Sequence, residues 1–225
     1  MAHDVALSGH VEETTTGLDN RKMIMWIFLS SECLLFGSLI ATYLVYHGKS
    51  LIGPFPGNTE FLPDGRVCTE VAALFSWDCH GIFNIPYTSI SAFVLLMSSL
   101  TMVLALSALQ NNDLRKTKIW IMATALLGMV FLGGQVFEFT TFAHDGLTLK
   151  SSLFGSSFFT LTGFHGAHVA IGVLILLSFY VQAQRGLLTQ ANNLNLELAG
   201  LYWHFVDVVW IVIFTVIYLF EAPNL

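Results

Sequence analysis

The sequence predicts an all-α membrane protein, with five transmembrane helices in one bundle. Hydrophobic residues make up 55% of the 225-residue chain and charged residues only 11%, with a mean hydropathy of +0.69. Soluble domains carry about 25% charged residues, so the bilayer is the expected solvent. Mostly apolar stretches of about 18 residues or more occur five times. Because lipid cannot satisfy loose backbone groups, each stretch is expected to be helical.

The five spans are separated by short connections and by one long loop. We place the spans at residues 23–46, 85–109, 119–142, 153–182 and 198–220. The fourth would be about 45 Å long as a helix, so it should tilt or protrude from the hydrocarbon layer. Residues 1–22 form a polar, acidic tail where a signal peptide would be basic. The loop 47–84 contains the turn sequences GPFPGN and LPDG, which argue against regular structure.

Basic residues predict the direction in which the chain crosses the membrane. One side of the spans carries Arg21, Lys22, Arg115, Lys116, Lys118 and Arg185, and the other carries Lys49, Arg66 and Lys150. Because cytoplasmic loops are enriched in lysine and arginine, we expect the N-terminus inside and the C-terminus outside. Cys68 and Cys79 would then share the outer loop in an oxidising compartment, where a disulfide between them can form. No basic patch indicates nucleic-acid binding.

Two carboxyl groups interrupt the first and third spans. Glu32 lies ten residues into the first span, where an ionised side chain is costly. It is either a proton-handling or lipid-contacting carboxyl, or a neutral acid hydrogen-bonded to a neighbouring helix. Glu138, in GGQVFEF, lies one turn from the outer end of the third span, and we expect it to reach the interface in a structural role.

The fourth and fifth spans each carry two polar residues with i, i+3 spacing. TGFHGAHVAIG places His165 and His168 on one helical face, and WHFVDVVW does the same for His204 and Asp207. Di-iron bundles use Glu-x-x-His pairs, which neither span contains. A haem would need histidines facing a cavity, for which the glycines beside His165 could make room. The residue types favour no metal ligand and no catalytic residue, and predict that the two pairs hydrogen-bond to each other. An independent membrane metalloprotein is the alternative from another class.

Four segments, in this order, resemble subunit III of the haem-copper cytochrome oxidases. They are SSECLLFGSLIATY, GGQVFEF, TGFHGAHVAIG and YWHFVDVVWIVIF. The resemblance covers about residues 22–221, and the combination of FHGxH with YWHFVDxVW is highly specific. It implies a subunit without redox cofactors, packed on the catalytic subunit I of a proton-pumping respiratory oxidase in a bacterial plasma membrane. Subunit II and small subunits would complete the complex, and partner subunits would hold the haem and copper.

The resemblance also implies roles for individual residues. Glu32 falls on a buried carboxyl linked to proton uptake and ordered phospholipid, and Glu138 on a glutamate that follows a Gly-Gln pair. His165, His168, His204 and Asp207 fall on polar residues inside the bundle. Many family members have seven spans with a lipid-filled cleft after the second, whereas this sequence matches the last five. The electron donor is left open between cytochrome c and quinol, as is a homologue attached to nitric oxide reductase.

Overall fold

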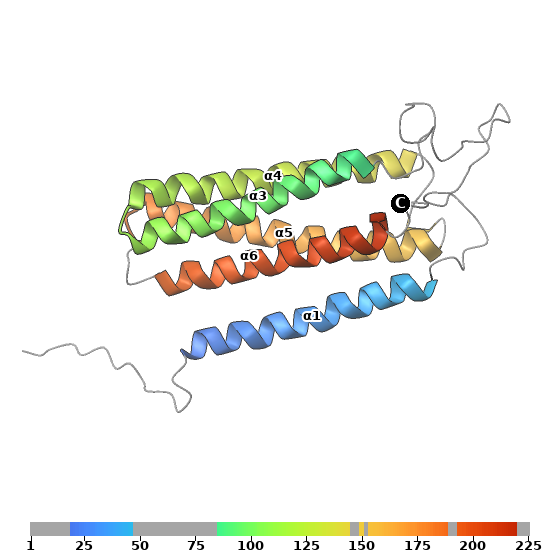
Figure 1. Ribbon diagram of the computed structural model, residues 1–225, viewed down its shortest axis with the longest axis horizontal. Coiled ribbons are helices and arrows are strands. Elements are labelled where there is room, and N and C mark those ends of the chain that lie inside the picture. Colours follow the sequence, from blue (N-terminus) through green and yellow to red (C-terminus); the bar gives the residue numbers. More distant parts are fainter. Residues whose placement is uncertain (1–18, 47–84, 145–148, 151–152, 189–192, 220–225) are drawn as a thin grey trace, which may run out of the picture.

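The computed structural model describes residues 19–46, 85–144, 149–150, 153–188 and 193–219, and the chain within them is helical apart from short turns (Figure 1). The elements are α1 (Asn20–Tyr46), α3 (Ile85–Gln110), α4 (Leu114–His144), α5 (Leu153–Gln184), α6 (Asn193–Phe214) and the π-helical segment η2 (Thr215–Leu219). Each of the five α-helices is long and apolar enough to cross a membrane. The prediction of an all-α, five-span protein is therefore confirmed. The tail to residue 18 and the loop 47–84, with Cys68 and Cys79, lie outside the described residues.

Four of the helices form a closed bundle, and α1 lies against one side of it. α3 packs on α4 and α6, and α5 also packs on α4 and α6, so that the four helices enclose a common core. α1 packs on α5 and α6 and stands apart from the α3–α4 pair (Figure 1). Only 11% of the apolar window of α1 is buried, against 50% for that of α6. α1 is thus the least buried of the five described helices.

A narrow seam attaches α1 to the bundle. Its buried residues are Leu29, Phe36 and Tyr43, which are seven residues apart. Met25, before Leu29, and Glu32, between Leu29 and Phe36, are partly buried. The resulting spacing of four and three residues is that of a coiled-coil seam. This periodicity places Glu32 at a position that faces the partner helices, between Leu29 and Phe36.

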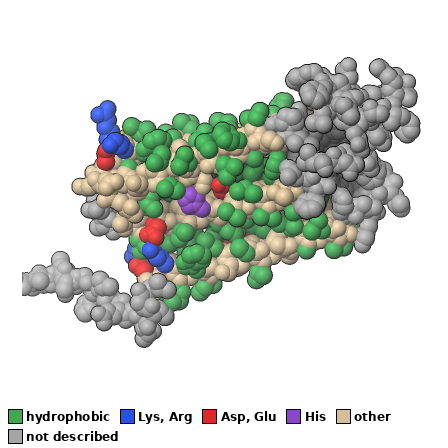
Figure 2. Space-filling model, in the orientation of Figure 1, with side chains coloured by type: hydrophobic (Ala, Val, Ile, Leu, Met, Phe, Trp, Pro, Cys, Tyr) green, Lys and Arg blue, Asp and Glu red, His purple; other side chains and the backbone are tan. Residues whose placement is uncertain are grey.

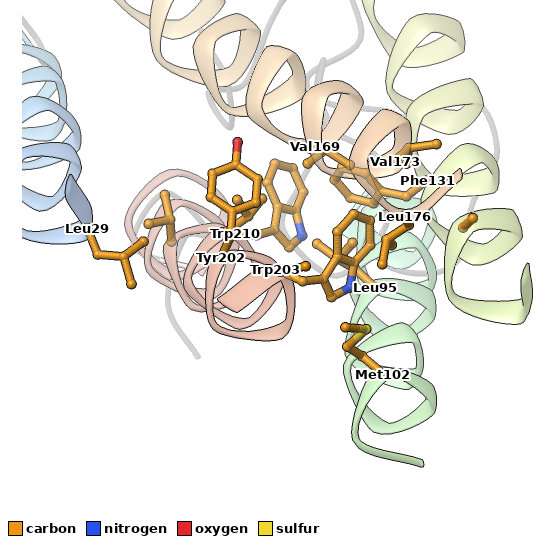
Figure 3. Close-up of a cluster of buried hydrophobic side chains, with 14 of the residues drawn as sticks. Leu29, Leu95, Met102, Phe131, Val169, Val173, Leu176, Tyr202, Trp203 and Trp210 are labelled. Atoms are coloured by element: carbon orange, nitrogen blue, oxygen red, sulfur yellow. The ribbon is translucent and has the colours of Figure 1, made fainter. Parts of the chain in front are cut away.

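Trp203 on α6 occupies the centre of the four-helix core. Its side chain is 1% exposed and lies among Leu95, Met102, Val173 and other apolar side chains from the neighbouring helices (Figure 3). A Cβ atom added at Gly128 on α4 or at Gly172 on α5 would lie 2.6 Å or 2.8 Å from the indole ring. The two glycines therefore allow the backbones of α4 and α5 to pack directly against this ring, as small residues do between membrane helices.

The two connections at one end of the bundle have the same capping geometry. After α3, Asn112 has φ 59° while its N–H and that of Asp113 donate to the carbonyls of Leu109 and Ala108. After α5, Gly186 has φ 69° and makes the corresponding i–3 bond. This is the Schellman motif, which needs a residue tolerant of positive φ. Hydrogen bonds from the side chain and backbone of Lys116 hold the pKa of Asp113 below its ordinary value at the start of α4.

The helices extend beyond the predicted spans at this end. α4 begins at Leu114 and α6 at Asn193, each five residues before the predicted start. The added segments, LRKTK and NLNLE, are polar, so a search for apolar runs leaves them outside the predicted spans. Their backbone hydrogen bonds nevertheless continue the two helices. Most of the charged side chains on the face shown in Figure 2 gather at this end. An ion pair between Lys22 and Glu197, at 2.7 Å, joins α1 to α6 near their first turns.

The close packing around Trp203 gives the first testable prediction. Gly128→Ala should lower the free energy of unfolding by about 1–3 kcal/mol, because the new methyl group overlaps the buried indole. Gly133→Ala, on the same helix, is the matched control, since nothing lies within 4 Å of an added Cβ there. Steric-trapping measurements in bicelles should show the loss for Gly128→Ala only. Equal effects at the two positions would contradict the tight α4–α6 contact.

Candidate functional site

Glu32 on α1 and His168 on α5 form a hydrogen-bonded pair. His168 Nδ1 lies 2.8 Å from the carbonyl oxygen of Phe164, and because a carbonyl only accepts, this nitrogen donates a hydrogen. His168 Nε2 lies 3.2 Å from Glu32 Oε2, so one proton lies between these two atoms. Either a neutral carboxylic acid donates it to a neutral imidazole, or an imidazolium donates it to a carboxylate. The pair is neutral as a unit in both arrangements, which lowers the cost of placing an acid inside the membrane.

His165, on the same helix, faces the core of the bundle. It is fully buried, and its Nε2–H donates to the backbone carbonyl of Val206 on α6 at 3.2 Å. Aromatic rings surround it, with the ring centroids of Trp210 and Phe131 at 4.9 Å and 5.9 Å. The i, i+3 spacing thus separates the two histidines: His165 joins α5 to α6, whereas His168 joins α5 to α1.

The polar residues of α6 have their partners on α3. His204 Nδ1 lies 2.5 Å from Ser99 Oγ, and the Trp203 indole donates to Ser98 Oγ at 3.0 Å. The Asp207 carboxyl, only 4% exposed, also interacts with the Ser99 hydroxyl. The expected direct pairing of His204 and Asp207 with the histidines of α5 is therefore wrong. The physical reason is rotation: this face of α6 lies against α3, and α5 meets a different face.

Glu138 does not reach the interface as expected. It is 9% exposed and accepts a hydrogen bond from Thr88 on α3 at 2.8 Å. α4 continues six residues beyond it to His144, which places the carboxyl deeper than the predicted span end implied. One turn earlier, Gln135 donates to the Thr162 carbonyl at 2.8 Å, and its amide lies 2.6 Å from where a Cβ at Gly166 would be.

Sequence reasoning missed Ser98, Ser99, Thr88 and Gln135 as partners. Each is a polar residue inside an apolar run, which is a signal that the sequence does contain. What it does not contain is the pairing, because serine and threonine in a helix can also bond to their own backbone. Ser30, for example, donates only to the Trp26 carbonyl, at 2.8 Å.

Three buried polar atoms have no hydrogen-bond partner within the described part of the chain. They are His165 Nδ1, Asp207 Oδ1 and Trp210 Nε1. Each costs free energy when left unsatisfied. The His165 and Trp210 rings lie together where α5 and α6 meet, with centroids 4.9 Å apart, whereas Asp207 lies on the face of α6 toward α3. The core has thus retained polar groups that purely apolar packing would not need.

A groove of about 510 Å³ opens where α1, α5 and α6 meet. Glu32 and His168 line it together with apolar side chains, among them Phe28, Ile171 and Tyr202. Its other end is lined by Asn195 at the start of α6. It therefore runs from the end of the bundle with the charged side chains to the Glu32–His168 pair.

The polar residues do not converge on a single point. His168 bonds to α1, His165 to the α6 backbone and His204 to α3. Among the described residues there is no group of three or more His, Cys, Asp or Glu side chains placed to hold a metal ion. His168, His165 and His204 each connect a different pair of helices, and Asp207 lies on the same face of α6 as His204, toward α3.

These observations define a multi-pass membrane protein whose buried polar side chains join helices. The sequence profile of the family Cytochrome c oxidase subunit III matches residues 1–222. Cytochrome c oxidase subunit 3 of Bacillus sp. strain PS3 is 38% identical over 201 residues, which cover 89% of this chain and 86% of that protein. The probable quinol oxidase subunit 3 of Staphylococcus saprophyticus is 35% identical over 97% of this chain and 96% of its own length. Cytochrome c oxidase subunit 3 of Bacillus subtilis strain 168 is 37% identical, over 92% and 90%.

The chain belongs to the cytochrome c oxidase subunit III family. The resemblance seen in the four sequence segments is thereby confirmed.

The contact between Ser99 and His204 gives the second testable prediction. In a double-mutant cycle of Ser99→Ala and His204→Phe, the coupling free energy should be about 0.6–1.7 kcal/mol, the range for hydrogen bonds between membrane helices. Ser30→Ala with His204→Phe is the matched control cycle, because Ser30 is exposed and bonds only to its own helix. Unfolding free energies in bicelles provide the measurement. Additive effects in the first cycle would show that the contact does not hold α3 to α6.

Proposed function

We propose that this chain is the non-catalytic subunit III of a proton-pumping aerobic terminal oxidase and packs on the catalytic subunit I. Family membership over residues 1–222 is the observation that carries the proposal. The site supports it, because the buried histidines and acids make helix–helix contacts within the described residues. Haem and copper would be held by the partner subunits and none by this chain. Subunit II and small subunits would complete the assembly.

The electron donor is cytochrome c or quinol, and the relatives include subunits named for each. We propose cytochrome c as the donor, with the quinol oxidase subunit as the second candidate. The donor binds elsewhere in such an assembly, so the same bundle serves in both. Bacterial relatives support a place in the plasma membrane. Arg21, Lys22, Lys116 and Arg185 lie at one end of the helices, which supports an inside N-terminus.

Within this assembly we assign Glu32 a role in proton supply. Its pair with His168 holds one proton between two atoms, and both side chains remain partly exposed, at 16% and 14%, toward the groove. The shared proton can move between Glu32 Oε2 and His168 Nε2 without changing the net charge of the pair, and a proton that the pair releases must be replaced from the groove for the pair to stay neutral. Phospholipid acyl chains would cover the exposed apolar side chains of α1 and exclude water from the α1 seam. α1, held by few buried residues, would be stabilised by such lipid and by subunit I.

Replacing Glu32 gives the third testable prediction. Glu32→Ala should leave the oxidase assembled but shorten its active life in turnover severalfold, because the exchangeable proton is lost. Glu32→Gln should behave in the same way, since an amide does not release a proton. Ser31→Ala is the control, because Ser31 bonds only to the Phe28 carbonyl. Oxygen consumption followed over many turnovers is the measurement. An unchanged active life in both Glu32 variants would contradict the role.

The location of the cofactors gives the fourth testable prediction. Purification in mild detergent should yield the chain together with a haem- and copper-containing protein. After harsher detergent removes that partner, metal analysis of the isolated chain should find no stoichiometric metal, and His165→Ala should not change the result. Metal retained by the isolated chain and lost in His165→Ala would instead establish an independent metalloprotein.

A further inference from the structure

The groove between α1, α5 and α6 has an unusual combination of depth and polarity. Glu32 lies ten residues along α1 from Lys22, about 15 Å along the helix axis and so near the middle of the hydrocarbon layer. Phospholipid headgroups do not reach this depth. Nevertheless, the groove ends there at a carboxyl–imidazole pair. An occupant that matched the whole groove would be apolar over most of its length and polar at this point.

The polar point offers a hydrogen-bond acceptor. Glu32 Oε2 shares a proton with His168 Nε2, while Glu32 Oε1 has no hydrogen-bond partner within the described residues. The Phe164 carbonyl fixes the hydrogen on His168 Nδ1, so the shared proton stays between Oε2 and Nε2. Oε1 is therefore an acceptor whichever atom of the pair carries that proton. A ligand group meeting it must donate a hydrogen.

The other end of the groove disfavours an anionic headgroup. Lys22 is already paired with the Glu197 carboxylate at 2.7 Å, and Arg21 lies 3.4 Å from the amide oxygen of Asn195, which lines the groove. A phosphate would have to displace these contacts and would meet the Glu197 charge. A neutral molecule is therefore a better match for this groove than an anionic one.

Aromatic side chains border the polar point. Phe28 and Tyr202 stand on opposite helices with ring centroids 6.3 Å apart and planes inclined by 30°. The Tyr202 hydroxyl is occupied, since it donates to the His168 carbonyl at 3.1 Å, so the two stacked rings present an aromatic, apolar border to the groove. The volume of about 510 Å³ is ordinary for a small-molecule site.

We propose that this groove binds a membrane hydroquinone, the reduced form of an isoprenoid quinone, with one ring hydroxyl donating to Glu32 Oε1. The ring lies beside Phe28 and Tyr202, and the isoprenoid tail follows the apolar side of the groove into the bilayer. The oxidised quinone binds more weakly, because its carbonyls only accept and meet another acceptor at Oε1. No electron transfer takes place at this site; it holds the reduced carrier within the oxidase subunit.

The hydroquinone site gives the fifth testable prediction, which photolabelling of the full-length chain in nanodiscs can check. An azido derivative of decylubiquinol should label peptides containing Phe28 or Tyr202, saturably and in competition with unlabelled decylubiquinol. The reduced probe should bind about tenfold or more tightly than the oxidised probe, as a hydrogen bond to a partly buried carboxyl predicts. Glu32→Leu removes the acceptor and should abolish this preference. Glu32→Gln keeps a carbonyl oxygen and should preserve it, and Ser31→Ala is the control.

Several outcomes would overturn the proposal. They are unsaturable labelling, equal affinity for the two redox forms, or a preference for the reduced form that survives in Glu32→Leu. Competition by added phosphatidylethanolamine but not by decylubiquinol would show that the groove holds acyl chains only. The test is separate from the proton-supply role, because Glu32→Gln should keep hydroquinone binding while losing turnover stability.

Discussion

The requirement that governs this structure is that every polar group in the hydrocarbon layer must find its partner within the protein. The chain meets it by joining helices in different pairs: Glu32 with His168, His165 with the Val206 carbonyl, His204 with Ser99, and Thr88 with Glu138. Each bond is individually modest in a membrane, about 0.6 kcal/mol on average. Their common effect is to fix which face of each helix meets which neighbour.

Close packing depends on that alignment. Trp203 can occupy the centre of the core only because Gly128 and Gly172 face it, and its indole is oriented by Ser98. Rotating α6 would bring larger side chains against the ring and would leave its N–H without an acceptor. Packing and hydrogen bonding therefore select the same arrangement. The atoms of His165, Asp207 and Trp210 that have no partner within the described residues show that the selection is incomplete.

α1 is the exception, and the proposed functions are concentrated at its contact. It is attached by one seam of seven-residue spacing, and the only carboxyl in that seam is Glu32. A helix so lightly held leaves a groove beside its polar pair. Neutrality of the pair as a unit allows the acid to remain exposed to that groove without a buried net charge. The same feature supports a role in proton supply and the binding of a neutral hydrogen-bond donor.

The sequence by itself determined the class of the protein, the five helices and the family, because apolar runs, a low charge content and a specific order of motifs are local properties of the chain. It also located Glu32, Glu138, His165, His168, His204 and Asp207. Only the tertiary structure decided their partners. The i, i+3 spacing of His165 and His168 predicts a shared face, but a helix face is wide enough for its two edges to meet different neighbours. The contacts of Ser99 with His204 and of Glu32 with His168 join residues 105 and 136 positions apart, and they depend on helix rotation, which the spacing of residues along one helix does not specify.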